Sequence, residues 1–364
     1  MTDTPRTDTV VATPDMDAFR APDRTVARWS ETAFVSGRSL HKDIGFFLHA
    51  GRCPTDLDLW WAQVATYLPG GDLAVGYTWG RCLDRAAITT GNLDLRVIAP
   101  HQQWSIRYDG VGQRTTTSAL AAHTVGSGPA LPMKWDINAH AAFPAWNMHN
   151  PTSTGTADDW ASAMHTQQAF RATGTISLGD ETYDFDGVCY NDHSRGVRSW
   201  GAFSGDISLM AVYPDFAVHG IKVWGPEGDV KITAGVLFDS HGSARPVRID
   251  FPAETDMLGN PRMLGVTIQD PDGGTELSMR AEALHVFPIA VTEHNDNLNG
   301  IDWDIPGDPL IFTESLVKLT TEDGQVGYGN LERSHKRSKD RQGRPEGDTN
   351  ARAPGGAPVA TVGE

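Results

Sequence analysis

The chain has 364 residues, of which 39% are hydrophobic and 21% charged, so it is long enough for two globular domains with cores of their own. Its net charge of −16 would repel a phosphate backbone, which argues against a nucleic-acid partner. The three cysteines lack metal or disulfide spacing, and neither a secretory signal nor a membrane span of about 18 apolar residues is found, so we expect a cytoplasmic location.

The first half of the chain predicts short strands. Residues 1–18 are rich in Thr, Asp and Pro, and we expect them to be disordered. Residues 56–67 fit either a short helix or a strand, and the turn Leu68-Pro-Gly-Gly-Asp72 that follows favours a hairpin with 73–79. Further strands are expected at 46–52, 94–99, 104–108 and 133–137.

The second half continues this pattern after one exception. Residues 157–170 have apolar side chains near helical spacing, so the connection 151–165 is expected to be partly helical. Gly179-Asp180 reads as a hairpin turn within 175–187. Later strands are predicted at 206–213, 219–224, 230–238, 244–250, 262–269 and 275–281, and the basic segment 333–364 is expected to be a disordered tail.

This succession of short strands with little helix predicts an all-β protein. We expect two antiparallel β-barrel or sandwich domains, one at 19–150 and one at 166–332. No Gly-x-Ser-x-Gly, His-Glu-x-x-His or Cys-x-x-Cys motif occurs, so hydrolase, zinc-protease and thioredoxin functions lack support.

The densest group of polar residues is Asp192-His193-Ser194-Arg195-Gly196-Val197-Arg198-Ser199-Trp200. If this segment is extended, side chains alternate between two faces, with His193 and Arg195 on one and Asp192 on the other. We expect His193 to face a ligand and to transfer protons, while Asp192 anchors or assists it. The alternative is a polar strand end in which Asp192 caps a turn and Arg198 pairs with a carboxylate.

A second candidate group lies in residues 131–148. Its aromatic side chains, Trp135 and Trp146 among them, could wall an apolar cavity, although ordinary core packing is the more common reason for each of them. Asp136, Asn138 or His140 would supply the polar group of such a cavity. No third ligand accompanies His140 and His149, so no metal site is predicted.

The motif Asp192-His-Ser-x-Gly-x-Arg-x-Trp200 resembles the Asp-His-Ser-Trp-Gly-x-Arg-x-Trp signature of a bacterial family of tandem lipocalin-like proteins. These are distant relatives of carotenoid 1,2-hydratase (hydroxyneurosporene synthase) and of fungal Diels–Alderases. Supporting similarities are at 47–52, 68–71, 135–136, 144–146, 165–168, 174–176 and 327–332. Arg195 stands where the family usually has Trp.

The resemblance implies two lipocalin-like (calycin) domains with an apolar cavity near their junction, and activity on isoprenoid or polyketide-like hydrophobes. It places His193, Arg198 and Trp200 near that cavity. The replacement of an aromatic residue by Arg195 favours a smaller, oxygenated substrate.

Together these observations predict a lyase or isomerase that acts on a hydrophobic, oxygenated isoprenoid, steroid or ring compound without a cofactor or metal. Catalytic proton transfer is assigned to His193, Asp136 and Asp192. Substrate binding is assigned to Trp135, Asn138, His140, Trp146, Arg195, Arg198 and Trp200. Two alternatives are a non-catalytic carrier of a hydrophobic small molecule and a structural interaction protein, the latter predicting no cavity at the domain junction.

Overall fold

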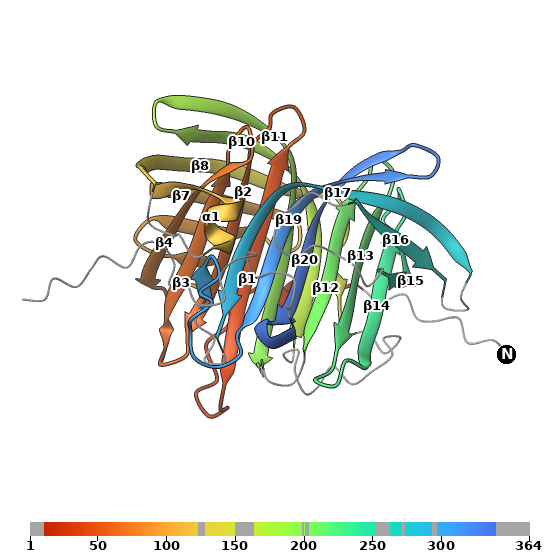
Figure 1. The fold of residues 1–364 in the computed structure, drawn as a ribbon, viewed down its shortest axis with the longest axis horizontal. Helices are drawn as coiled ribbons and strands as arrows, with labels where there is room; N and C mark the ends of the chain where they lie inside the picture. Colours follow the sequence, from red (N-terminus) through yellow and green to blue (C-terminus); the bar gives the residue numbers. More distant parts are fainter. Residues whose placement is uncertain are drawn as a thin grey trace, which may run out of the picture.

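The computed structural model describes residues 11–122, 128–149, 164–198, 200, 204–251, 263–270, 274–292 and 297–339. Within these ranges the chain is almost entirely β-structure, arranged as two antiparallel barrels that lie side by side (Figure 1). Eight of the described strands close into a ring in each barrel. The predicted all-β class is therefore confirmed.

The first barrel closes because β4 pairs with both β3 and β7, which gives the ring β1-β2-β3-β4-β7-β8-β10-β11. The hairpin β5–β6 and the short β9 are attached at its margins. The strands are β1 (Trp29–Ser39), β2 (Gly45–Cys53), β3 (Asp56–Tyr67), β4 (Asp72–Arg81), β5 (Ala87–Thr89), β6 (Leu93–Ala99), β7 (Gln103–Thr116), β8 (Ala130–Ala141), β9 (Trp146–Asn147), β10 (Met164–Leu178) and β11 (Glu181–Val197).

The second barrel closes through the pairing of β16 with β17, in the ring β12-β13-β14-β15-β16-β17-β19-β20. Its strands are β12 (Gly205–Val212), β13 (Ala217–Trp224), β14 (Val230–Phe238), β15 (Ala244–Asp250), β16 (Met263–Gln269), β17 (Thr275–Val291), β19 (Leu310–Thr321) and β20 (Val326–Lys336), with β18 (Asn297–Asn299) beside β17. Both barrels thus follow chain order around the ring, because each strand pairs with its neighbour in sequence.

Two of the predicted hairpins are present. β3 and β4 pair across the turn at 68–72, where Gly70 and Gly71 both adopt positive φ values of 84° and 90°. Glycine reaches this region without the steric cost that a Cβ imposes. Likewise, β10 ends at Leu178 and β11 begins at Glu181, with Gly179 at a φ of 57° between them.

The predicted helix is wrong over its described part, since residues 164–178 form β10. Residues 150–163 lie outside the described residues. The first seven residues of β10 are all buried, because one face of the strand points into the first barrel and the other packs on the second. A strand buried on both faces lacks the polar–apolar alternation that would identify it. The described helices are only α1 (Thr117–Ala121) and two 3₁₀ turns, and none of them could cross a membrane.

The strand pairing also corrects the predicted partition of the chain. We expected 166–332 to make up the second β-domain, yet β10 and β11 belong to the first sheet, where β11 pairs with β1. Closing the first ring requires these two strands, so the second barrel begins with β12 at Gly205.

The ends of the chain are ordered further than expected. Residues 14–16 form a 3₁₀ turn, and the buried Asp17 accepts hydrogen bonds from the backbone N–H of His101 (2.7 Å) and the indole of Trp104 (3.1 Å). At the other end, β20 runs to Lys336 and Arg337 donates to the carbonyl of Trp303 at 2.8 Å. These hydrogen bonds hold in place two segments, 11–18 and 333–339, that were expected to be disordered because of their composition.

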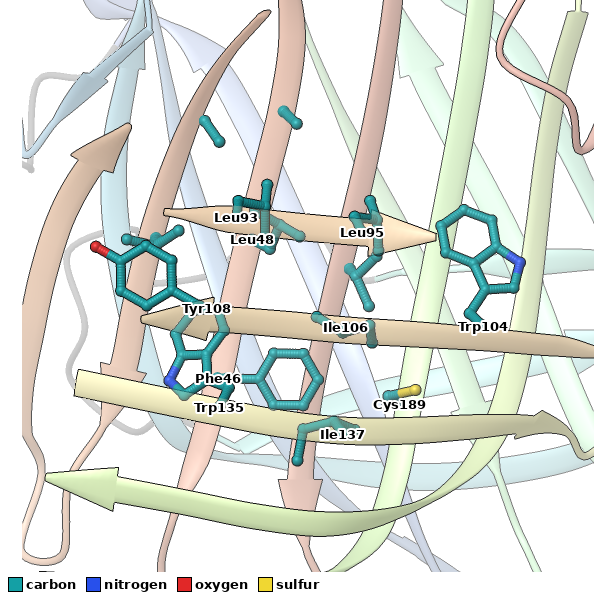
Figure 2. Close-up of a cluster of buried hydrophobic side chains, with 14 of the residues drawn as sticks. Phe46, Leu48, Leu93, Leu95, Trp104, Ile106, Tyr108, Trp135, Ile137 and Cys189 are labelled. Carbon is teal, nitrogen blue, oxygen red and sulfur yellow. The ribbon is translucent and has the colours of Figure 1, made fainter. Parts of the chain in front are cut away.

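Aromatic side chains fill the interior of the first barrel. Trp60, Trp104 and Trp135 are each about 1% exposed, and Trp135 packs against Phe46 and Tyr108 with ring centroids 5.4 and 5.0 Å apart. Figure 2 shows Phe46, Tyr108 and Trp135 grouped together, with Leu93, Leu95 and Ile106 beside them and Trp104 further along the barrel. The interior is therefore a packed core.

A separate hydrophobic cluster joins the two barrels. β1 and β11 lie beside β19 and β20 at the centre of Figure 1, and β10 lies against β12. Phe47 packs edge-on against Phe287 at 4.8 Å, and Ser36 donates to Asn330 at 3.0 Å across the junction. Side chains that point outward from each ring thus form a buried interface.

Candidate active site

A cavity lies within this interface and is lined by both barrels. Strands β1, β2, β10 and β11 contribute from the first barrel, and β12, β13, β17, β19 and β20 contribute from the second. Its volume is about 60 Å³, room for a few water molecules at roughly 10–15 Å³ each. One part of the lining is polar and ionisable, while the rest is apolar.

Asp192 faces the cavity from β11 as an ionised carboxylate. Its two oxygens lie 2.8 Å from Nε2 of His165, and Gln167 Nε2 donates to Oδ2 at 3.0 Å. Burial alone would raise the pKa of Asp192, but the charge and hydrogen bond of His165 and the hydrogen bond of Gln167 lower it below its usual value. With 22% of its side chain exposed, Asp192 can accept a proton or a hydrogen bond from the cavity.

Gln167 connects the two barrels beside this carboxylate. The same Nε2 also donates to the hydroxyl of Ser208 on β12 at 3.0 Å. The side chain is 2% exposed, and its Oε1 finds no hydrogen-bond partner among the described residues.

Three further carboxyl groups meet on the opposite wall. Glu314 on β19 and Glu332 on β20 are directly opposite residues in an antiparallel pair, and Asp206 on β12 hydrogen-bonds with Glu332. Like charges directly opposite one another repel, so such a pair retains a proton. Burial first, and then the neighbouring carboxylates, raise the pKa of Glu332 well above its usual value and that of Glu314 to about 7.

Hydrogen bonds hold these carboxyl groups in place. Asn330 donates to Glu314 Oε2 at 3.0 Å, and the hydroxyl of Ser334 hydrogen-bonds with Asp206. Burial also raises the pKa of Asp206. The wall therefore carries protons that a ligand in the cavity could receive.

Arg198 supplies positive charge to the same cavity. Its NH2 donates to Ser194 Oγ at 2.6 Å, and its guanidinium lies 4.9 Å from the ring centroid of Trp200. Its Nε is buried and has no hydrogen-bond partner among the described residues. Nearby, burial and then the Arg198 charge lower the pKa of His49 to about 4, so His49 is a neutral imidazole at pH 7.

The remaining wall of the cavity is apolar. Trp200 packs edge-on against Phe312, with ring centroids 5.9 Å apart. The other apolar lining residues are Phe34, Ile221, Ile289 and Val291.

Of the predicted site residues, Asp192, Arg198 and Trp200 line this cavity. His193 and Arg195 do not, because they project from the other face of β11. His193 is fully buried with its Nε2 3.3 Å from Glu31, and Arg195 donates to the carbonyl of Ala18 at 2.7 Å. The alternation along β11 was predicted, but the cavity lies on the face of Asp192 and not on the face of His193, which was expected to meet the ligand.

The residues predicted within 131–148 do not line this cavity, and the structure does not bring them together. Trp135 lies in the core of the first barrel, where it donates to Thr66 at 2.8 Å. Asp136 is half-exposed and pairs with Arg107 at 3.2 Å, while Asn138 and His140 share its outward face of β8. Trp146 packs in the hydrophobic cluster between the barrels without lining the cavity.

Sequence reasoning missed the acid cluster and gave no role to His165 and Gln167. An acid within the otherwise apolar run Leu310-Ile-Phe-Thr-Glu314 was a signal, since a charge is rarely buried without a partner. Its partner Glu332 follows only from the register of β19 and β20. Among the described residues, no group of three or more His, Cys, Asp or Glu side chains is arranged to hold a metal ion.

The fold is shared with several solved structures. An AttH-like protein from Nitrosomonas europaea superposes with a TM-score of 0.60 at 13% identity, covering 84% of this chain and 92% of that one. Kievitone hydratase from Nectria haematococca gives 0.52 at 8% identity, over 92% and 95% of the two chains. CghA with Sch210972 gives 0.53 at 11% identity, over 90% and 97%. At these identities the likeness concerns the fold alone.

No curated protein matches the sequence. The predicted relation to carotenoid 1,2-hydratase therefore stays a prediction. A family model described as a domain of unknown function, DUF7064, matches residues 13–337, which span both barrels. The chain belongs to the DUF7064 family.

Proposed function

We propose that this protein is an acid–base enzyme of the lyase or isomerase type, a hydratase, dehydratase, cyclase or isomerase, acting on a hydrophobic, oxygenated small molecule in the cavity between the barrels. One observation carries the proposal. An ionised carboxylate, Asp192, and a carboxyl group that keeps its proton, Glu332, line the same cavity. Environments that push the pKa values of two acids apart are typical of acid–base active sites.

For a hydration, Glu332 would give its proton to one carbon of an alkene, and Asp192 would take a proton from the water that attacks the other carbon. The net result is addition of one water molecule, and the reverse sequence is a dehydration. The aromatic rings of Trp200 and Phe312 would stabilise developing positive charge by about 0.5–2 kcal/mol each. His165 is a positioning residue that keeps Asp192 ionised.

The fold comparison supports the proposal by analogy only, since one protein with this architecture is named a hydratase. The cavity of about 60 Å³ also argues against a large rigid substrate: a one-ring ligand already requires its walls to shift, and a steroid would require the two barrels to move apart.

The test is a screen of small alkenes, allylic alcohols and enones in ¹⁸O-labelled water and, separately, in deuterated water. Hydration would incorporate the oxygen label, and isomerisation would incorporate deuterium without a net gain of water. On any substrate found, Asp192→Asn and Glu332→Gln should each lower turnover about 10²–10⁴-fold. Matched control variants are Asp136→Asn and Glu282→Gln, both on exposed strand faces.

Full turnover in both active-site variants would reject the proposal. The alternative of a carrier is favoured by the apolar wall of the cavity. It predicts that ligands are returned unchanged, that Phe312→Ala weakens binding, and that Glu332→Gln has no effect on it.

A further inference from the structure

We propose that the ligand of this cavity carries a neutral hydroxyl group, as an alcohol, enol or phenol, held between Asp192 and Arg198. The inference rests on the proposed function for its site and narrows the substrate class. It follows from the hydrogen-bonding capacity that two residues lining the cavity, Asp192 and Arg198, leave unused.

On one side the ligand must donate a hydrogen bond. An ionised carboxylate only accepts, with about four lone-pair directions on its two oxygens. The N–H groups of His165 and Gln167 use part of this capacity, and the exposed part of Asp192 faces the cavity.

On the other side the ligand must accept one. A guanidinium only donates, and the N–H at Nε of Arg198 has no acceptor among the described residues. A buried donor without a partner destabilises the protein, and an oxygen of the ligand would satisfy it.

Only a group that both donates and accepts meets these two requirements. An ammonium group would donate to Asp192, but Arg198 would repel it and its Nε would stay unpaired. A carboxylate would accept from Arg198, but it would meet four carboxyl groups in the cavity. An ether accepts without donating.

The charges of the cavity agree with a neutral ligand. Asp192 and Arg198 offset one another, and the raised pKa values keep protons on the Glu314–Glu332 pair. The hydrocarbon part of the ligand would lie against Phe34, Trp200 and Phe312. An apolar compound with one hydroxyl group matches both walls.

Calorimetric titration at about pH 6, below the raised pKa of Glu314, tests this with one-ring probes that differ in a single group. The probes are para-ethylphenol, para-ethylanisole, para-ethylbenzylamine and para-ethylbenzoate. We expect the phenol to bind about tenfold more tightly than the anisole, because one net hydrogen bond changes a dissociation constant by about that factor. The amine and the benzoate should bind more weakly than the phenol.

Two variants test whether Arg198 and Asp192 cause the preference for the phenol over the anisole. In Arg198→Met and in Asp192→Asn the advantage of the phenol over the anisole should fall to within about twofold. Arg107→Met and Asp136→Asn, which break an exposed ion pair on the first barrel, should keep it. Either active-site variant suffices if the other fails to fold.

Equal binding of phenol and anisole by the native protein would overturn the inference, and so would tighter binding of the amine or the benzoate. A tenfold preference for the phenol over the anisole that survives in both variants would also overturn it. Because none of these probes needs to react, such results leave the turnover test of Glu332 untouched, and the two proposals can fail separately.

Discussion

The two faces of β11 differ in what surrounds their polar side chains: one face is sealed inside the first barrel, and the other lines the cavity of the proposed active site. On the inner face, His193 joins Glu31 and Arg52, whose side chains are 0% and 5% exposed, with the Arg52–Glu31 distance at 2.9 Å. On the outer face, Asp192 is 22% exposed and meets Arg198 across a cavity.

The difference lies in what each face leaves unsatisfied. Glu31 accepts from the Arg52 and His193 side chains and from the backbone N–H of Arg20. Burial alone would raise the pKa of Glu31, but His193 and Arg52 lower it, so its charge is compensated inside the protein. On the inner face, Nδ1 of His193 also has no hydrogen-bond partner among the described residues, but His193 is fully buried and does not line the cavity. On the outer face, Asp192 and its neighbours Gln167 and Arg198 keep unused hydrogen-bonding capacity and do line it. A polar cluster at a motif therefore indicates a ligand site only where its unused hydrogen-bonding capacity belongs to side chains that line a cavity.

The largest effect on stability is expected from a substitution of Glu31, the β1 residue that contacts His193 on the inner face of β11. Glu31→Gln should lower the free energy of unfolding by about 3–5 kcal/mol, because it leaves the buried Arg52 charge without a carboxylate. Chemical denaturation of the purified variant measures this. Binding of para-ethylphenol by the folded fraction should be unchanged, and a loss of binding without a loss of stability would contradict the division between the two faces.

A smaller, pH-dependent effect is expected at the acid cluster. The pKa of Glu314 is raised from 4.5 to about 7 in the folded protein, so its stabilising contribution is complete below about pH 4.5 and is lost as the pH rises towards 7 and above. Glu314→Gln removes this loss and should raise the free energy of unfolding at pH 7.5 by roughly 1–3 kcal/mol, with little change at pH 4.5.

Denaturation curves of the native protein and Glu314→Gln across pH 4.5–7.5 provide the measurement, with Glu282→Gln on the exposed face of β17 as the control. The lowered pKa of Asp192 acts in the opposite direction, since its stabilising contribution disappears only as the pH falls below about 4. Parallel curves for Glu314→Gln and the native protein would show that the carboxyl groups ionise normally.

The smallest effect is expected at Asp136, to which the sequence analysis assigned proton transfer although it lies far from the motif at 192–200. Asp136→Asn should change the free energy of unfolding by less than about 0.5 kcal/mol, because its ion pair with Arg107 is half-exposed on both sides. Thermal unfolding and probe binding should both match the native protein. A marked loss of turnover in this variant would place chemistry on the outer face of β8 and contradict the site described above.

Much of the architecture could be predicted from local patterns. Alternating apolar residues and the turns at 68–72 and 179–180 predicted hairpins that are present. The helix predicted for 157–170 was wrong where the structure describes it, because β10 is buried on both faces and its apolar spacing carried no strand signal. Composition also predicted disorder for residues 11–18 and 333–339, which side-chain hydrogen bonds to distant backbone hold in place.

The sequence by itself determined many of the strands of this protein and the alternation that separates Asp192 from His193, since both follow from the two-residue period of a β-strand. Only the tertiary structure decided which face of β11 is sealed inside a barrel and which meets a cavity. Likewise, it alone brought Asp206, Glu314 and Glu332 together from three strands. The reason is physical: local conformation depends on neighbouring residues, whereas burial, charge repulsion and unused hydrogen bonds depend on side chains that the closing of two barrels brings into contact.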